Sequence, residues 1–343
     1  MLFSFEPGSK GTTEESYSIR LPIVVSPGKE ISLEKEGVNL VLEGYKARVQ
    51  RKGNLYVFTI TDFPSEQMAN AFLRKIGAGL IWADLRYHVG FRFSIEPTPI
   101  QYHDQPVEIS DQSMTANLKS QTGWTHIDGD YYGNNTVVVP EHKRLILFKM
   151  GELNVIVGTG ASILAQTVSE AMAYPNPERV FDEPKLKLAY EVYSSAFFER
   201  SDNARFLTLV MVLEALCSDS DASNSVVEMV DELMRQLKES GSKSFKELHD
   251  RDYETLVSRL GSLKKRSIKQ GISSLVAEKL KLDEGVNDPT AVGREVSEIY
   301  DLRSKLVHDG IAAPNAVKQA MTRLEDIVPR VLKVMFSQIA KGT

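Results

Sequence analysis

Apolar residues in the first half of the chain gather in short runs typical of β-strands, and those in the second half recur with the period of helices. β-branched and aromatic residues dominate three segments that we expect to be strands, 18–25, 38–43 and 55–60. Lys52-Gly53-Asn54 predicts a tight turn that joins a strand at 45–50 to the next strand in a hairpin. Further strands are expected at 91–95, 136–139, 144–148 and 153–157. One helix is expected to begin at Pro64 and another to cover 161–173. This pattern predicts an α+β domain over residues 1–175.

The second half of the chain has the spacing of amphipathic helices instead. Two prolines in Tyr174-Pro-Asn-Pro-Glu178 end the preceding helix and stiffen the connection, so we place a domain boundary there. Helices are predicted at 184–198, 203–217, 225–238, 253–270, 290–308 and 315–339. Their expected caps are Ser201 or Asp202 for the second helix, Asp288 before Pro289 for the fifth, and Gly310 after the fifth. Residues 176–343 are therefore predicted to form an all-α helical bundle.

Two charges stand where this pattern expects hydrophobic residues. Arg303 occupies a place on the apolar stripe of the fifth predicted helix, which is otherwise formed by Val292, Val296, Ile299 and Leu306. Glu214 is the only charge in the apolar run Phe206–Cys217. A charge on a buried helix face is costly unless it is paired. We therefore hypothesise that Glu214 and Arg303 meet between the two helices, either as a core ion pair that fixes the helix register or as part of a functional site.

His308 follows Arg303 by five residues on the same predicted helix. The two side chains should leave a regular helix about 140° apart, so one regular helix cannot bring both to one ligand. They could converge if the helix ends at His308, as Gly310 suggests, or if a second chain approaches. The alternative is a histidine that only caps carbonyl groups at the end of its helix.

Composition and charge narrow the classes of function. The chain has 41 basic and 46 acidic residues, a formal net charge of −5, which excludes a broadly basic coat for nucleic acid. The single cysteine cannot form an internal disulfide and is typical of a reducing compartment, so we expect a cytoplasmic protein. No targeting segment is visible and the longest apolar run is too short to span a membrane, so no membrane partner is expected. The histidines lack the spacing of metal ligands, and we expect no metal and no other cofactor.

One local stretch is basic enough to be a candidate RNA contact. It contains Lys264, Lys265, Arg266 and Lys269, and flexible cations of this kind neutralise phosphates. The alternative interpretation is an ordinary solvated helix face.

The helical half resembles the HEPN superfamily, and within it the Apea-like branch. The resemblance is carried by Arg303-Ser-Lys-Leu-Val-His308, which is similar to the R-x4–6-H motif of that superfamily, by the preceding Glu298-Ile-Tyr-Asp-Leu302 and by the following Asp309-Gly310. The helix Ala204–Leu216, with Glu214 before its final apolar turn, also looks like the earlier helix of that branch. The resemblance covers roughly Pro184–Ile339. The chain departs from the common superfamily pattern at Ser304, where members often have Asn, Asp or His although serine is usual in the Apea-like branch. It departs again at Asp309, which stands where relatives often have glycine directly after the histidine.

The resemblance implies small helical bundles that dimerise and place two copies of the motif in one cleft, many of which are metal-independent endoribonucleases. By this resemblance, Arg303 would hold the scissile phosphate and His308 would carry the proton. Glu214 would orient the arginine, and Ser304, the residue after Arg303, would belong to the same catalytic site. These residue types suit RNA cleavage. The pKa of histidine lies near neutrality, so it can exchange protons, and the planar guanidinium of arginine can bind two phosphate oxygens at once.

We accordingly expect a HEPN-type endoribonuclease, a hydrolase acting as a homodimer or higher assembly in anti-phage defence or as a toxin. Residues 1–175 would form its sensing or regulatory domain, with RNA and an antitoxin or a phage-derived trigger as partners. The alternative is a non-catalytic HEPN protein that binds RNA or protein, with Arg303 and Glu214 purely structural. A further alternative is a regulator that binds a small molecule or nucleotide through the first half.

Overall fold

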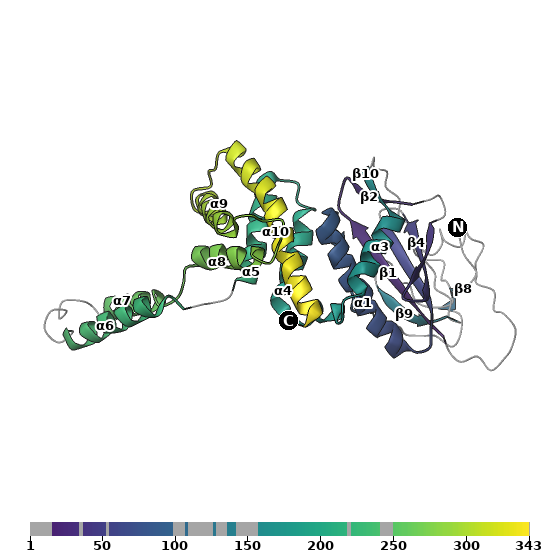
Figure 1. Cartoon of the computed structure of the whole chain (residues 1–343), viewed down its shortest axis with the longest axis horizontal. Helices are drawn as coiled ribbons and strands as arrows, with labels where there is room; N and C mark the ends of the chain where they lie inside the picture. Colours follow the sequence, from purple (N-terminus) through teal and green to yellow (C-terminus); the bar gives the residue numbers. More distant parts are fainter. Residues whose placement is uncertain are drawn as a thin grey trace. The chain divides into compact units, whose positions relative to one another are not determined.

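The computed structural model describes residues 16–33, 37–52, 55–98, 107–108, 126–127, 136–141, 157–217, 221–240 and 250–342. The chain divides into two compact units (Figure 1). The first contains Met1–Arg200 together with Met335–Thr343, and the second contains Ser201–Val334. The predicted order, an α+β part followed by helices, is confirmed at this level, because an antiparallel sheet precedes the run of helices.

The first unit is built on an antiparallel sheet with the strand order β3-β4-β5-β1-β6, in which β9 also pairs with β1. Its strands are β1 (Tyr17–Val25), β3 (Val38–Leu42), β4 (Tyr45–Lys52), β5 (Leu55–Phe63), β6 (Phe91–Arg92) and β9 (Val137–Pro140). Two smaller pairings join β2 (Lys29–Ser32) to β10 (Val157–Gly160) and β7 (Val107–Glu108) to β8 (His126–Ile127).

The sheet confirms most of the strand predictions. The predicted hairpin is present, with Lys52 of β4 opposite Leu55 of β5, and its turn residues 53–54 lie outside the described residues. The strand expected at 91–95 is shorter and ends at Arg92. The strand expected at 144–148, and all but the last residue of the one at 153–157, fall outside the described residues.

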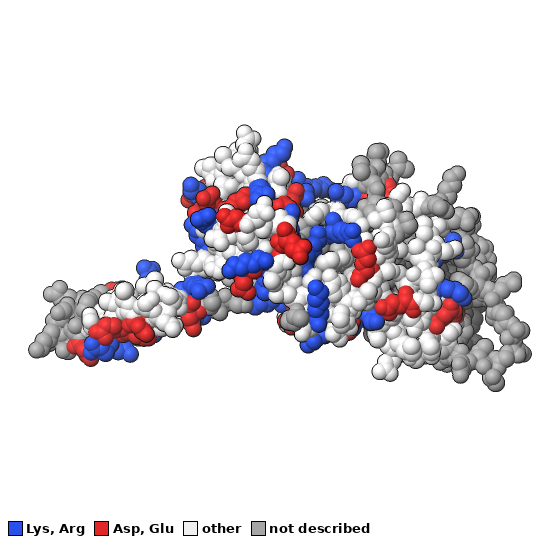
Figure 2. All heavy atoms as spheres, in the orientation of Figure 1, with Lys and Arg blue, Asp and Glu red and all other residues white. Residues whose placement is uncertain are grey.

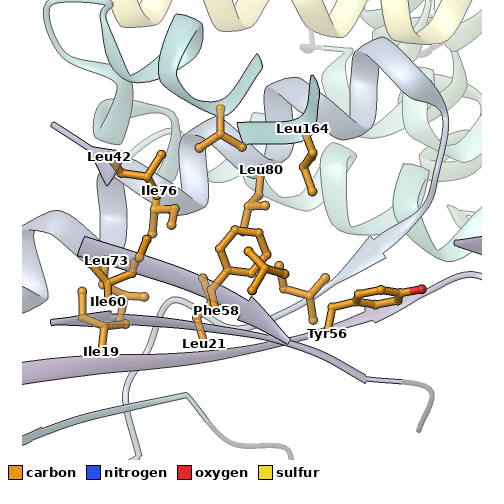
Figure 3. Packing of buried hydrophobic residues seen from close by; sticks show 14 of the residues in the cluster. Ile19, Leu21, Leu42, Tyr56, Phe58, Ile60, Leu73, Ile76, Leu80 and Leu164 are labelled. Carbon is orange, nitrogen blue, oxygen red and sulfur yellow. The ribbon is translucent and has the colours of Figure 1, made fainter. Parts of the chain in front are cut away.

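Two helices cover one face of this sheet and close its core. They are α1 (Glu66–Tyr87) and α3 (Ala161–Met172). Figure 3 shows Leu73, Ile76 and Leu80 of α1 and Leu164 of α3 above the strand residues Ile19 and Phe58. The helix expected from Pro64 begins slightly later, because β5 continues through Phe63 and the Ser65 side chain caps α1 by accepting a hydrogen bond from the Met68 amide.

A fully buried carboxylate fixes the next helix, α4 (Pro184–Ala196), to the turn after α1. Asp84 accepts hydrogen bonds from the amides of Gly90 (2.6 Å) and Phe91 (3.1 Å) and from the Tyr190 hydroxyl of α4 (3.0 Å). In the same turn, His88 Nδ1 lies 2.8 Å from the hydroxyl of Tyr193, which also belongs to α4. These contacts make α4 part of the first unit.

The predicted domain boundary near Asn176 therefore differs from the division of the structure, which follows Arg200. The prolines do end α3, and a short 3-10 helix, η1 (Pro177–Phe181), follows them. Helix α4 nevertheless packs on the first unit, and so does the end of α10 (Pro314–Lys341), where the Phe336 ring lies 5.1 Å from that of Trp82. A proline-rich connection marks the end of a helix, and tertiary contacts decide where a domain ends.

The second unit contains α5 (Asp202–Leu216), α6 (Asn224–Ser240), α7 (Asp250–Ser262), α8 (Ile268–Leu280), α9 (Pro289–Asp309) and the greater part of α10. The predicted caps are confirmed. Ser201 and Asp288 accept hydrogen bonds from amides in the first turns of α5 and α9, and Gly310 ends α9 with a left-handed φ of 69°.

One helix prediction is wrong in this unit. The segment 253–270 is not a single helix, because α7 ends at Ser262 and α8 starts after Ser267, which forms a reciprocal capping box with Gln270. Helix α8 was not predicted at all, although its Ser-x-x-Gln start is visible in the sequence. None of the helices in the described part of the chain combines the length and hydropathy needed to cross a membrane.

We predict that Asp84 makes the first unit more stable in mild acid. Burial raises the pKa of this carboxyl to about 6, against the lowering effect of its hydrogen bonds, while in the unfolded chain it is near 3.8. The resulting stability is fully present below pH 3.8 and is lost as the pH rises through 6, by up to about 3 kcal/mol.

The measurement is urea unfolding of the wild type and Asp84→Asn, followed by tryptophan fluorescence at several pH values between 4.5 and 7.5. The difference in unfolding free energy between the two proteins should shrink as the pH rises. A difference that is constant over this range contradicts the prediction.

Candidate active site

Helices α5 and α9 bring the two anomalous charges together. Arg303 Nη2 lies 3.1 Å from Glu214 Oε1 and 3.4 Å from Oε2. The two side chains are 23% and 22% exposed, so the pair is sheltered but reaches solvent. Helix α5 supports it with an apolar body whose buried residues are Phe206, Leu209, Val210, Val212, Leu213 and Leu216. The hypothesis that these two charges meet between the helices is confirmed.

The apolar stripe of α9 is buried only in its middle. Val296 and Ile299 are buried, whereas Val292, Arg303 and Leu306 are half-buried. The arginine therefore lies where the stripe emerges from the core. This position lowers the desolvation cost of the charge and leaves its guanidinium accessible from one side.

The guanidinium is only partly used by the protein. Among the residues that the structure describes, its hydrogen bonds all pass through Nη2, and Nη1 has no partner. Its Nε is buried and likewise makes no hydrogen bond there. Arginine has five N–H donors in a planar fork, so donors remain for an anion that approaches the exposed side.

Sequence reasoning missed a third member of this cluster, Tyr300. Its ring centroid lies 5.5 Å from the Arg303 guanidinium. Burial raises the pKa of the Tyr300 phenol, the negative charge of Glu214 raises it further, and the positive charge of Arg303 opposes both effects. The signal that could have revealed it is its spacing, one turn before Arg303 on the same helix.

His308 lies apart from this cluster in the last turn of α9 and is exposed. The helix continues through His308 to Asp309, so it does not end early enough to turn the histidine toward Arg303. The two side chains leave one regular helix about 140° apart. No hydrogen bond joins His308 to another described residue, so the alternative of a histidine that caps carbonyl groups is not realised there. Ser304 is half-buried beside Arg303.

The basic stretch does not form one helix face. Lys264, Lys265 and Arg266 lie in the connection between α7 and α8, and Lys269 lies in the first turn of α8. Lys264 forms an ion pair with Asp231 of α6, and Lys269 Nζ lies 2.7 and 2.8 Å from the two carboxylate oxygens of Asp301.

These ion pairs reduce the charge that the stretch could offer to RNA. Lys265 shares an isolated β-bridge with Asp221, and Arg266 is exposed. Figure 2 shows acidic and basic side chains interleaved over the visible face of the helices, not gathered by sign. Asp301 lies between Tyr300 and Arg303 in the sequence, however, so its pairing with Lys269 places the start of α8 beside the motif.

A cavity of about 380 Å³ lies elsewhere in the second unit, between the α8–α9 loop and α10. Two arginines line it and both are engaged: Arg323 Nε lies 2.6 Å from Glu295, and Arg330 Nη1 lies 3.2 Å from Asp283. Neither Arg303 nor His308 contributes to its lining. Asp326 of the lining also contacts both arginines, and Asp288 accepts the Ala291 amide as the cap of α9.

Comparison of the chain with protein-family models, with curated proteins and with solved structures found no match. Within the described residues, no three His, Cys, Asp or Glu side chains are placed to hold a metal ion together.

We predict that breaking the pair from one side destabilises the second unit. Glu214→Ala and Arg303→Ala should each lower the unfolding free energy by about 1–3 kcal/mol, because the remaining charge stays sheltered without its partner. The double variant Glu214→Leu/Arg303→Met should be close to wild type, since both charges are removed together. Urea unfolding followed by far-UV circular dichroism measures this. Single variants as stable as wild type would show that the ion pair does not stabilise the fold.

Proposed function

We propose that this protein is a metal-independent endoribonuclease of HEPN type. The observation that carries the proposal is the contact between Glu214 and Arg303, which leaves Nη1 of a sheltered, positively charged guanidinium without a partner among the described residues. An arginine that is held by a carboxylate on one side and reaches solvent on the other is suited to bind a phosphate. His308, exposed on the same helix, can carry a proton.

RNA supplies its own nucleophile, so the reaction does not require a bound metal. The 2′-hydroxyl oxygen attacks the adjacent phosphorus and loses its proton to a base, while the bond from phosphorus to the 5′-oxygen breaks and that oxygen takes up a proton. The products are a 2′,3′-cyclic phosphate and a free 5′-hydroxyl. Histidine is suited to both proton transfers, and Arg303 would stabilise the charge that develops on the phosphorane oxygens.

The angle between the two motif residues favours a site made by two copies of the chain. Since Arg303 and His308 diverge on one helix, His308 of one copy would act on a phosphate held by Arg303 of the other. Hydrophobic side chains next to the histidine support this arrangement, because Val307 is 49% and Ile311 is 78% exposed. Exposed apolar residues beside a functional histidine are suited to contact with a second copy.

The first unit would then act as a sensing or regulatory domain, and RNA would be the substrate. Arg266, exposed beside the start of α8, is the best placed of the predicted basic residues to contact RNA, because Lys264 and Lys269 are already paired with acids. We place the activity in anti-phage defence or a toxin system, with an antitoxin or a phage-derived molecule as its regulator.

A second candidate function is a non-catalytic module that binds RNA or protein. It is favoured by one observation: Glu214 and Arg303 satisfy each other across two packed helices, which is what a purely structural pair would also do.

The test is RNA cleavage by the purified protein and RNA integrity in bacteria that express it. His308→Ala and Arg303→Ala should each reduce cleavage by about 100-fold or more, because a proton carrier and a phosphate ligand are lost. EDTA should leave wild-type cleavage unchanged, and Lys318→Ala, at an exposed position of α10, serves as the control. A wild type that leaves RNA intact with every trigger tried favours the binding module, and an active His308→Ala overturns the assignment of the proton carrier.

We predict that a charge at position 307 prevents dimerisation. Val307→Asp should convert a dimer to a monomer in sedimentation equilibrium and should abolish cleavage with it, because desolvating the carboxylate in an apolar contact is costly. Val41→Asp is a matched control at an exposed valine of β3 in the other unit. A Val307→Asp variant that still dimerises would place the interface elsewhere.

A further inference from the structure

Helices α6 and α7 form a hairpin and pack mainly on each other (Figure 1). The amide of Ala222, just before α6, donates to the carbonyl of Lys264, just after α7, at 2.7 Å, so the two helices run antiparallel. The apolar residues of α6 occupy about 160° of its circumference, which is more than one neighbouring helix covers. Part of this surface therefore lacks a partner within the hairpin.

Exposure separates the apolar residues of α6 into two rows. One row is buried or half-buried and consists of Val227, Val230, Met234 and Leu237. In the other row, Val226 is 40%, Met229 65% and Leu233 45% exposed. The first row is covered by α7, and the second is left open.

Helix α7 shows the same division. Its half-buried apolar residues are Tyr253, Val257 and Leu260. Leu256, and Leu263 directly after the helix, are exposed. On both helices the exposed row is turned in the same sense from the covered row, which in an antiparallel pair places both exposed rows on one side. We call this surface the hairpin face, formed by Val226, Met229, Leu233, Leu256 and Leu263.

We propose that the hairpin face binds the same face of a second copy of this chain. In this arrangement α6 of each copy packs on α7 of the other, and the four helices form an antiparallel bundle. A twofold axis parallel to the helices relates the two copies. The inference extends the two-copy contact proposed at Val307 and does not depend on RNA cleavage.

The charges along the edges of the hairpin face favour this occupant. Glu232 flanks the exposed row of α6, and Arg259, which has no ion pair with another described residue, flanks that of α7. When α6 lies over α7 of the second copy, these two opposite charges face each other. Packing α6 over α6 would instead bring together two acidic edges, each with Glu228, Glu232 and Glu239, and like charges oppose association.

The size of the hairpin face explains why it acts together with the end of α9. Two helices about 25 Å long and 10 Å apart offer roughly 500 Å² per copy, below the ~800 Å² of a standard interface. Helix α8 runs antiparallel to α9, and Lys269 in its first turn pairs with Asp301. The base of the hairpin therefore lies toward the C-terminal end of α9, where Val307 and Ile311 are exposed. The two apolar surfaces contribute to one dimer, which needs both.

The first arm of the test is sedimentation equilibrium of the full chain. Leu233→Asp should raise the dissociation constant of the dimer by at least about tenfold, because the carboxylate would lose its water in an apolar contact. Ser258→Asp is the matched control, since it adds the same charge at an exposed position on the opposite side of α7. Far-UV circular dichroism checks that both variants keep their helices. A Leu233→Asp variant that associates as tightly as wild type overturns the inference.

The second arm tests which helices meet. In a Cys217→Ala background, Met229→Cys and Leu263→Cys chains are mixed, allowed to exchange and oxidised. The two kinds of chain should become linked by a disulfide, because α6 of one copy lies against α7 of the other. Met229→Cys chains alone should cross-link at least about tenfold more slowly, since the two α6 helices are diagonal in the bundle. Equal rates overturn the arrangement.

This inference and the proposed function fail in different experiments. A wild type that is monomeric but cleaves RNA overturns the hairpin contact and leaves the ribonuclease activity standing. A dimer that depends on Leu233 but leaves RNA intact overturns the ribonuclease activity and supports the hairpin contact.

Discussion

The close packing of α8 against α9 is the constraint on which the candidate site depends. A side chain at Gly293 of α9 would bring its Cβ to 2.7 Å from the backbone oxygen of Ser273 on α8, so only glycine allows this approach. The Ser273 hydroxyl then donates to the Gly293 carbonyl at 2.8 Å. This contact fixes α9 near its start, the Lys269–Asp301 ion pair fixes it again near the motif, and Arg303 is thereby held against α5.

The contrast between two carboxylates shows how the units differ. Asp84 is fully buried, and its hydrogen-bond donors, two amides and a phenol, are all neutral. Because no cation compensates for the loss of water, burial raises the pKa of this carboxyl. Glu214 is sheltered but has a cation as its partner. The first arrangement joins a helix to a sheet and offers nothing to a ligand. The second keeps two opposite charges at the edge of the core, where a phosphate can compete for one of them.

The pairing of Glu214 with Arg303 could be predicted because each charge interrupts a helical pattern that is otherwise apolar, and two such interruptions in one bundle have few other partners. The hairpin and the caps of α5 and α9 were predictable for a similar reason, since turn and cap residues act locally. The break between α7 and α8 was missed because a basic segment with helical spacing continues across it, and the cap at Ser267 was overlooked. The role of α4 could not be predicted, because it depends on which elements lie side by side and not on the pattern within one segment. Tyr300 was detectable only through its spacing from Arg303 on the same helix.

Helix geometry decides how the motif can work at all. Five residues of regular α-helix separate Arg303 from His308, and α9 remains helical through both positions. An imidazole and a guanidinium that act on one phosphate must both come within hydrogen-bond reach of it. His308 lies in the last turn of α9, where the neighbouring Val307 and Ile311 are apolar and exposed, whereas Arg303 is 23% exposed and lies beside Glu214. In the proposed two-chain site, His308 of one copy would act beside Arg303 of the other, which removes the angular conflict within one helix.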